Sequence, residues 1–301
     1  MNNFVTLITT GGTIASVADP SGVRRPVLGA HDLLAATGYQ GRVKVREAVR
    51  KDSSLLDFAD VDQIRRIVAQ ELDNPSVSGV VVAHGTDTME ETAILLDLLT
   101  GGDKPVVLTG AARPASDPAT DGPANLRHAL AFAASPGARG AGAVICFAGA
   151  TLAARGAHKR HTGGDDVFGG RAHAKGAPAV KAPACDIAAT RVDLVALCQG
   201  ADRTGVDASV AAGARGLVLA TMGNGGVPDS VTQAVAEHAR AGIAVVACSR
   251  VLGAPVTPEY SGGARLIAAG ALLAAELSAP QARMQLAAVL ASGSDPRRFP
   301  W

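Results

Sequence analysis

Apolar residues in this chain gather in short runs, and several of the runs end in small polar residues. The first run, Val5–Ile8, leads into the hydroxyl- and glycine-rich turn Thr9–Thr13. A second run, Ser78–Ala83, ends in His84–Thr88. Apolar runs bounded by turn residues are typical of strands buried on both faces, as in parallel sheets. We predict strands at residues 5–8, 43–49, 78–83, 105–108 and 143–147.

Between these strands the apolar positions recur at helical spacing. One face of residues 60–72 carries Val61, Ile64, Val68 and Leu72, which predicts an amphipathic helix. Further helices are expected at 31–36, 89–99 and 124–134. Strands that alternate with helices indicate an α/β fold. We therefore predict a larger N-terminal domain with a mostly parallel sheet and helices on both faces.

The pattern changes after this domain. Residues 155–189 are rich in Gly, Pro, Ala, His and Lys and show no clear period, which indicates a surface arm and a linker. Regular alternation then resumes, with strands expected at 192–197, 216–220 and 244–247 and helices at 208–214, 230–241 and 280–291. The predicted organisation is an N-terminal catalytic domain (1–170), a linker (171–190) and a smaller C-terminal α/β domain (191–301).

Composition narrows the class of protein. The chain has 301 residues, of which 48% are hydrophobic and only 3% aromatic, so the core must consist of Ala, Val, Leu and Ile. A net charge of +1 argues against a nucleic-acid partner or an anionic membrane surface. No apolar run is long enough to span a membrane, and no signal-peptide pattern is evident.

The cysteines point to a cellular compartment. Cys146, Cys185, Cys198 and Cys248 are widely spaced and form no CxxC motif. We expect them to be buried, unpaired residues of a reducing compartment, which predicts a cytoplasmic protein.

Polar residues follow several of the predicted parallel strands. Thr10, Asp52-Ser53 and Thr86-Asp87 each come directly after an apolar run. The carboxyl ends of parallel strands meet at one edge, where open α/β sheets bind ligands. A hydroxyl such as that of Thr10 becomes a nucleophile when a base takes its proton. Gly11 and the glycine after it allow a sharp turn and a close approach of ligand.

Structural alternatives exist for the same residues. Thr10 and Thr13 can bond to the turn backbone. Asp87 and Glu90 have the spacing of a capping box at the start of the helix that follows. Residues 18–26, with two prolines and a glycine, form a predicted mobile loop, which is a natural lid over a site at the strand ends.

Lys159 lies in Arg155–Thr162 (RGAHKRHT). A solvated loop charge is the ordinary role of such a lysine. If it reaches the strand ends, however, Thr86, Lys159 and Asp87 form a relay of hydroxyl, base and carboxylate. His158 and His161 form an HxxH pattern without further ligands at metal-site spacing, so no metal is predicted.

Several longer motifs in the sequence resemble those of a known protein family. TTGGTIA (9–15) and VAHGTDTMEETA (82–93) resemble the two signatures of the bacterial-type L-asparaginase/glutaminase family. KPVVLTGAARP (104–114) with DGPANL (121–126), MGNG (222–225) and CSRV (248–251) resemble further parts of its pattern. The resemblance spans nearly the whole chain in the right order.

The resemblance implies roles for particular residues. Thr10 matches the nucleophile, and Thr86, Asp87 and Lys159 match a second catalytic group, although GAHKRHT replaces the usual VTKT around Lys159. The remaining matches are to substrate binding. Asp52, Ser53 and Gly11 lie where the substrate's α-amino and α-carboxylate groups bind, and a neighbouring subunit offers Asn224 and, by a weaker match, Glu259.

The resemblance also implies a reaction and an assembly. The reaction is hydrolysis of L-asparagine to L-aspartate and ammonia, with no metal or organic cofactor. The assembly is a homo-oligomer, a dimer or a homotetramer built of close dimers. Alternatives are a glutaminase-asparaginase of broad specificity and a non-catalytic amino-acid-binding relative. An amidotransferase subunit acting on charged tRNA is disfavoured, because it needs an extra N-terminal domain.

One departure concerns the lid. The family carries a tyrosine there that hydrogen-bonds the nucleophile, whereas residues 22–29 read GVRRPVLG. The only tyrosines are Tyr39 and Tyr260. Tyr260 of a partner subunit is one replacement, and Arg24 or Arg25 can instead clamp a carboxylate.

Overall fold

The structure is a computed structural model that describes residues 3–164, 166–174 and 180–301. The chain divides into two compact units, Met1–Lys181 and Ala182–Trp301. The predicted linker at 171–190 includes residues 175–179, which lie outside the described residues, and its boundaries stay predictions. The predicted fold class, a larger mostly parallel α/β domain followed by a smaller one, is confirmed.

The first unit contains a six-stranded sheet in the order β4-β1-β5-β6-β7-β8. Its first five strands are parallel, and β8 runs antiparallel to β7. The sequence pattern predicted the five parallel strands but not β8. In chain order the strands are β1 (Phe4–Gly11), β4 (Val43–Lys51), β5 (Val77–Ala83), β6 (Val106–Thr109), β7 (Ala143–Phe147) and β8 (Ala150–Ala153).

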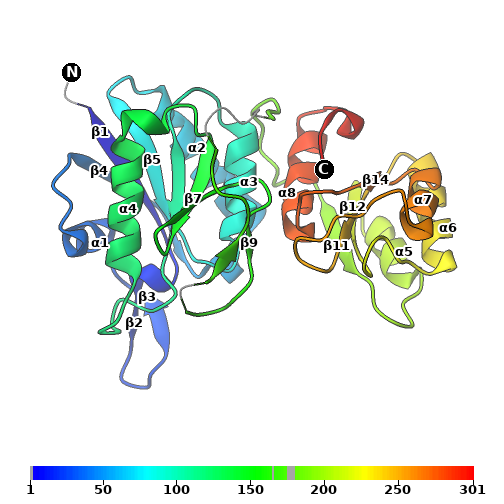
Figure 1. Cartoon of the computed structure of the whole chain (residues 1–301), viewed down its shortest axis with the longest axis horizontal. Coiled ribbons are helices and arrows are strands. Elements are labelled where there is room, and N and C mark those ends of the chain that lie inside the picture. The colour runs from blue at the N-terminus through cyan, green and yellow to red at the C-terminus, as the bar shows by residue number, and fades with distance from the viewer. Residues whose placement is uncertain (1–2, 165, 175–179) are drawn as a thin grey trace. The chain divides into compact units, whose positions relative to one another are not determined.

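Two pairs of helices cover the two faces of this sheet (Figure 1). One pair is α1 (Ala30–Thr37) and α4 (Gly122–Ala134), and the other is α2 (Phe58–Asp73) and α3 (Met89–Leu99). Local signals begin two of them: Asp57 caps α2 by accepting the Asp60 N–H at 2.9 Å, and α4 has a proline in its first turn.

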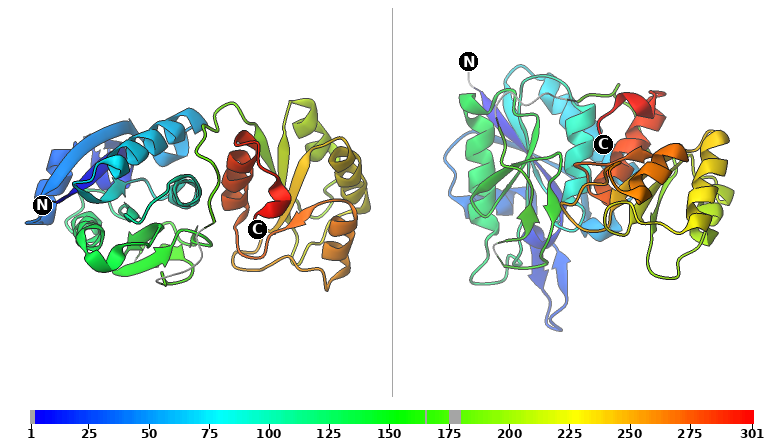
Figure 2. Two further views of the ribbon diagram at one scale, coloured as in Figure 1. Left: turned by 90° about the horizontal axis from the view of Figure 1, so that it is seen from above. Right: turned by 45° about the vertical axis from the view of Figure 1, so that its right-hand side comes forward.

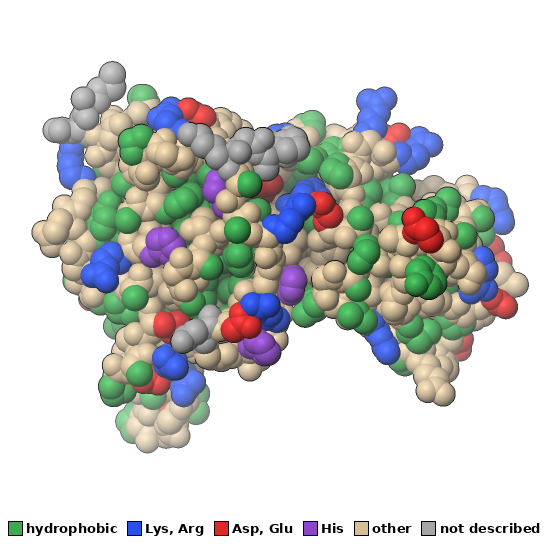
Figure 3. Space-filling view, in the orientation of Figure 1, with side chains coloured by type: hydrophobic (Ala, Val, Ile, Leu, Met, Phe, Trp, Pro, Cys, Tyr) green, Lys and Arg blue, Asp and Glu red, His purple; other side chains and the backbone are tan. Residues whose placement is uncertain are grey.

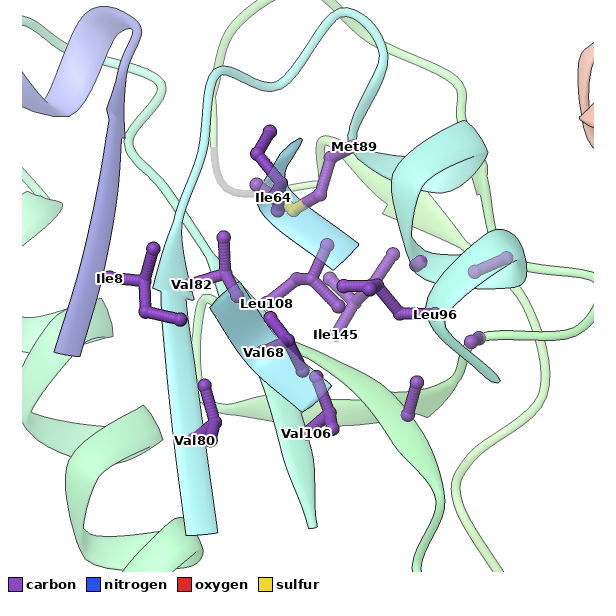
Figure 4. Packing of buried hydrophobic residues seen from close by; sticks show 14 of the residues in the cluster. Ile8, Ile64, Val68, Val80, Val82, Met89, Leu96, Val106, Leu108 and Ile145 are labelled. Atoms are coloured by element: carbon purple, nitrogen blue, oxygen red, sulfur yellow. The ribbon is translucent and has the colours of Figure 1, made fainter. Parts of the chain in front are cut away.

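The core between the sheet and the α2–α3 pair consists of aliphatic side chains (Figure 4). Ile64 and Val68 come from α2 and Leu96 from α3, and they pack against Val82 and Leu108 of the sheet. All five are fully buried. The apolar positions that predicted the helices therefore face the apolar positions that predicted the strands, and together they form one core layer.

The order of the strands creates a topological switch point in the sheet. From β1 the chain passes through α1 to β4 on one side, and from β5 it passes through α3 to β6 on the other. Helices α1 and α3 cover opposite faces of the sheet, so the connections that follow β1 and β5 lead away on different sides. Open α/β sheets bind ligands at such a switch point.

The predicted lid is more regular than expected. A short antiparallel hairpin, β2 (Ser16–Ala18) and β3 (Arg24–Pro26), projects after β1. The Asp19 carboxylate closes its tip by accepting the backbone N–H groups of Ser21 at 2.9 Å and Val23 at 3.1 Å. Side-chain capping of the turn, rather than a strand pattern, produces this element.

The prediction of a surface arm after residue 155 is partly wrong. Two short strands, β9 (His158–Lys159) and β10 (Phe168–Gly169), form an antiparallel pair. Ala157, Val167 and Phe168 of this segment are buried in the α2–α3 core. Phe168 meets Phe147 edge to face, with ring centroids 5.3 Å apart. Scattered apolar residues, which show no period, are enough to fasten the segment to the domain.

The second unit is built around a parallel sheet in the order β11-β12-β13-β14. Helix α8 packs on one face, and α5, α6 and α7 lie on the other (Figure 2). The strands are β11 (Val192–Ala196), β12 (Gly216–Thr221), β13 (Ala244–Ser249) and β14 (Leu272–Leu273), and the helices are α5 (Thr204–Ala211), α6 (Asp229–Arg240), α7 (Ser261–Ala268) and α8 (Ala279–Ala291).

Three elements of this unit differ from prediction. Helix α5 begins four residues early, at Thr204, whose N–H donates to the Asp202 side chain at 2.9 Å. Helix α7 and strand β14 were not predicted. Helix α7 opens on Gly262 and Gly263, which are poor helix formers. A Cβ on Gly262 would overlap the Gly225 carbonyl, so packing selects the glycine there.

The only tryptophan of the chain, Trp301, is buried in the second unit. Its indole N–H donates to Pro296 O at 3.0 Å. Its carbonyl accepts the Ala275 N–H at 2.9 Å. The last residues of the chain are thus part of the packed unit.

The four cysteines are unpaired. Cys146 and Cys248 are buried as predicted, and burial raises the pKa of their thiols to about 11 and about 12. Cys185 is half-buried and Cys198 is exposed, so the prediction of four buried cysteines is wrong for these two. Cys198 follows β11 directly at an exposed loop, where the apolar pattern ends.

The visible surface mixes both signs of charge. Figure 3 shows Lys and Arg side chains interspersed with Asp and Glu, as a net charge of +1 suggests. No helix in the part of the chain that the structure describes is both long and apolar enough to cross a membrane.

Truncation of a core side chain tests this packing. We expect Leu96→Ala to lower the free energy of unfolding of the first unit by about 2–5 kcal/mol, because it leaves a cavity between α3 and the sheet. Urea unfolding followed by far-UV circular dichroism measures the change. Leu55→Ala is the control, since Leu55 is 67% exposed and its truncation should cost under about 0.5 kcal/mol. Equal effects would contradict the core assignment.

Candidate active site

The end of β1 places Thr10 in a buried position. The Thr10 side chain is 1% exposed, and its hydroxyl donates to Ala83 O at the end of β5 at 3.2 Å. Gly11 and Gly12 follow with φ of +99° and +77°, values that favour glycine. A Cβ on Gly12 would overlap the Gly85 backbone. The turns after β1 and β5 are therefore in direct backbone contact.

The turn after β4 joins the same group. Asp52 is exposed, and Ser53 is buried at the start of a short 3-10 turn. The Thr88 hydroxyl donates to Ser53 O at 3.0 Å. A Cβ on Gly85 would lie 2.6 Å from Ser53 Oγ. Since β4, β1 and β5 are neighbours in the sheet, all three predicted polar strand ends meet at one place.

Lys159 reaches this group from the β9–β10 hairpin. Its ammonium donates to Thr86 Oγ1 at 2.8 Å and to Asp87 Oδ1 at 2.6 Å. The Lys159 side chain is 15% exposed, whereas that of Asp87 is 60% exposed. The altered segment GAHKRHT thus still brings its lysine to the threonine and the carboxylate. The ammonium is desolvated on one side and paired on the other, which orients the Thr86 hydroxyl.

The capping alternative for Asp87 and Glu90 is not what the structure has. Helix α3 begins at Met89 after Thr88, and no side chain caps it. The Asp87 carboxylate instead pairs with Lys159. The Glu90 carboxylate accepts the backbone N–H of Lys159. Both acids therefore point to the lysine rather than to the helix end.

His84 is a buried polar residue to which the sequence gave no role. Its Nδ1 lies 2.7 Å from Gly85 O and its Nε2 lies 2.9 Å from Thr92 Oγ1. A carbonyl only accepts, so Nδ1 carries the hydrogen and Nε2 accepts from the threonine. Burial lowers the pKa of His84 to about 4. A neutral imidazole thus fixes the backbone just before Thr86.

A second network shapes the loop after β6. The Asp121 carboxylate accepts the backbone N–H groups of Ala112 and Arg113, both at 2.9 Å. The Asn125 amide donates to Gly110 O at 3.0 Å. Its oxygen accepts the N–H of Ala148 at 3.0 Å, a residue with φ of +46°. The polar start of α4, in the DGPANL motif, was the available signal for this network.

Asn224 and Glu259 lie in the second unit and meet through Thr257. Asn224 accepts the Thr257 N–H at 2.7 Å and donates to its hydroxyl oxygen at 3.0 Å. A hydrogen bond from the same Thr257 lowers the pKa of the exposed Glu259. Asn224 and Tyr260 also line an open hollow of about 720 Å³. Asn224 and Glu259 are thus linked through Thr257 within the second unit.

The candidate replacements for the lid tyrosine are solvent-facing. Arg24 and Arg25 are exposed on β3, and Arg25 Nε lies 3.9 Å from Asp19 Oδ2. Tyr260 is 64% exposed. Tyr39 instead packs against the α1–α4 core, where burial raises the pKa of its phenol. Tyr39 is therefore a structural residue.

The two histidines of the HxxH pattern have separate partners. His158 Nδ1 lies 3.0 Å from Gly156 O, and His161 Nε2 lies 3.7 Å from Asp166 Oδ2. Across residues 3–164, 166–174 and 180–301, no three His, Cys, Asp or Glu side chains group as metal ligands would.

Comparisons with known proteins agree with this architecture. Residues 4–182 match the family described as asparaginase, N-terminal, and residues 191–299 match the glutaminase/asparaginase C-terminal domain. The chain belongs to the asparaginase family.

Individual relatives extend this result. The L-asparaginase of Bacillus licheniformis is 32% identical over 97% of both chains. A glutaminase-asparaginase of Acinetobacter glutaminasificans is 38% identical over 51% of this chain and 48% of its own. The crystal structure of a probable cytoplasmic L-asparaginase from Campylobacter jejuni superposes with a TM-score of 0.84 at 28% identity, covering 98% of this chain and 97% of the other.

The buried His84 predicts a specific pH dependence. Its folded-state pKa of about 4 lies below the unfolded value of about 6.5. As pH falls from about 6.5 to about 4, the unfolded chain binds a proton that the folded one excludes, so stability falls. We expect a loss of up to about 3 kcal/mol.

The measurement compares urea unfolding of wild type with His84→Gln at several pH values. The difference between the two proteins should change over this window and be flat above about pH 7. A difference that is constant from pH 7 to pH 4 would show that His84 titrates normally.

Proposed function

We propose that this chain is an L-asparaginase, an amidohydrolase that converts L-asparagine to L-aspartate and ammonia through a threonine acyl-enzyme. The observation that carries the proposal is the contact of Lys159 with Thr86 and Asp87 beside the turn that holds Thr10. Membership of the asparaginase family and relatives named L-asparaginase support the same reaction.

In the first step Thr10 Oγ bonds to the side-chain amide carbon of asparagine. The carbon–nitrogen bond breaks, the hydroxyl proton passes to the departing nitrogen, and ammonia leaves. Backbone N–H groups of the strand-end turns stabilise the oxyanion of the tetrahedral intermediate. The burial of Thr10 supports this step, since electrostatic stabilisation is stronger where water is excluded.

In the second step a water hydrolyses the ester. The Thr86 hydroxyl orients this water, Lys159 orients the hydroxyl, and Asp87 holds the lysine ammonium. The water's oxygen bonds to the acyl carbon, the bond between this carbon and Thr10 Oγ breaks, a proton of the water passes to Oγ, and aspartate is released. No metal or organic cofactor enters either step.

The substrate's two charged ends require separate contacts. We propose that Asp52 binds the α-amino group and that Ser53 with the Gly11 backbone binds the α-carboxylate. Support comes from the positions of these residues at the carboxyl ends of β4 and β1, which are neighbouring parallel strands. We propose that Asn224 and Glu259 complete the site of a neighbouring subunit. The assembly would be a homo-oligomer, either a dimer or a homotetramer built of close dimers, and the protein would be cytoplasmic.

Two further candidates follow from specific observations. Relatives named glutaminase-asparaginase make glutamine a second substrate to test, and one methylene changes affinity by only about 1–3 kcal/mol. The lid without a tyrosine makes a non-catalytic amino-acid-binding protein the other candidate. Thermal stabilisation by aspartate with no ammonia from either amide would favour the binding protein.

Loss of the proposed nucleophile is the first test. We expect Thr10→Val to lower ammonia release from asparagine by at least about 10³-fold, because no hydroxyl remains to form the ester. Thr9→Val is the matched control: Thr9 is a neighbouring buried threonine whose hydroxyl contacts Arg46 O at 3.5 Å. Wild-type turnover in a folded Thr10→Val protein would exclude this mechanism.

Loss of the lysine tests the second step. We expect Lys159→Met to lower kcat by about 10²–10⁴-fold, since Thr86 loses its charged partner. Lys104→Met is the control, because Lys104 is also part-buried but binds Leu72 O and Asn74 O, both at 2.6 Å. A burst of about one ammonia per site in Lys159→Met would place the block after acylation. An unchanged kcat would remove Lys159 from the mechanism.

A further inference from the structure

Glu90 is a buried carboxylate that the proposed reaction does not use. It is the second residue of α3 and is 6% exposed. Its Oε2 accepts the backbone N–H of Lys159, a contact between residues 69 positions apart. Burying an ionised carboxylate is costly unless it is hydrogen-bonded. A buried acid at this place therefore indicates a specific task.

The lysine it meets stands on a weakly supported element. Strand β9 is two residues long and pairs with the equally short β10. Apolar contacts fasten β10, through Phe168 against Phe147, and Ala157 of the preceding turn is fully buried. Such contacts keep the hairpin packed against the core. They do not fix the exact position of the Lys159 backbone, because dispersion and burial are not directional.

The hydrogen bond from the Lys159 backbone N–H to Glu90 is directional and can fix the position of this backbone. Thr86, Asp87 and Glu90 lie within five consecutive residues at the start of α3. The short segment 86–90 therefore contacts both the side chain of Lys159, through Thr86 and Asp87, and its backbone, through Glu90. Figure 1 shows β9 next to α3. Movement of α3 would carry the hydroxyl, the carboxylate and the lysine together.

We propose that Glu90 is a positioning residue that sets the Lys159 ammonium against Thr86 and Asp87 by holding the Lys159 backbone. The inference rests on the proposed function. It explains how the lysine keeps its contacts of 2.8 and 2.6 Å although the segment around it departs from the family's VTKT pattern.

Glu90→Ala removes the acceptor. We expect kcat for asparagine to fall about 10- to 100-fold, since the lost hydrogen bond is to a charged group and a misplacement of about 1 Å costs up to about 100-fold. The KM should change by no more than about twofold, because substrate-binding groups are untouched. Glu90→Gln keeps an acceptor of the same reach and should retain kcat within about threefold.

A double-mutant cycle with Lys159→Met separates positioning from a general structural role. In the Lys159→Met background, adding Glu90→Ala should change kcat by less than about twofold, because the side chain it positions is gone. Glu71→Ala is the matched control: Glu71 is a buried carboxylate bound by Lys44 and Thr6, each at 2.9 Å. It should lower stability and leave kcat unchanged.

The outcomes are distinct. A wild-type kcat in Glu90→Ala, or an equal loss with and without Lys159, overturns the positioning role. An unchanged kcat in Lys159→Met removes the lysine, and Glu90 with it, from the mechanism, whereas absence of ammonia release from asparagine by folded wild-type protein overturns the proposed function itself. If Glu90→Ala does not fold, Glu90→Asp replaces it: it keeps the charge, shortens the reach, and should lose kcat while Glu90→Gln keeps it. Equal kcat in Asp and Gln variants contradicts the inference.

Discussion

The site depends on the close packing of three strand-end turns. Gly12 meets the backbone of Gly85, and Gly85 in turn meets the side chain of Ser53. Only hydrogen atoms fit at these two contacts, so the turns after β4, β1 and β5 approach one another more closely than any side chain would permit. This constraint brings the ends of β1 and β5, which carry Thr10 and lead to Thr86, into contact, and the parallel sheet beneath supplies the rigid base that functional loops require.

The charged groups at the candidate site are arranged around the ammonium of Lys159. Lys159 stands between the exposed carboxylate of Asp87 and the buried one of Glu90, the first bonded to its side chain and the second to its backbone. The neutral His84, whose pKa burial lowers to about 4, adds no competing cation. The pair at Asp87 is half in solvent and contributes little to stability; its value lies in orientation.

The sequence predicted those parts of the molecule that repeat. Apolar runs gave the five parallel strands, and the polar residues after them gave the strand ends where Thr10, Ser53 and Thr86 meet. It did not predict the β9–β10 hairpin or α7. In the hairpin, isolated apolar residues such as Phe168 act without a period. In α7, Gly262 is required by a distant carbonyl rather than by the helix. The role of Glu90 is set by Lys159, 69 positions along the chain, and no local sequence pattern shows it.

The position of Trp301 has a spectroscopic consequence. It is the only tryptophan, and it is buried within the second unit, so the protein's indole emission reports on the surroundings of that unit alone. The first unit is silent at this wavelength, apart from Tyr39. Fluorescence would follow the second unit, whereas backbone dichroism would follow both. The two transitions recorded on one sample should coincide if the units melt as one cooperative body and differ if they melt in sequence.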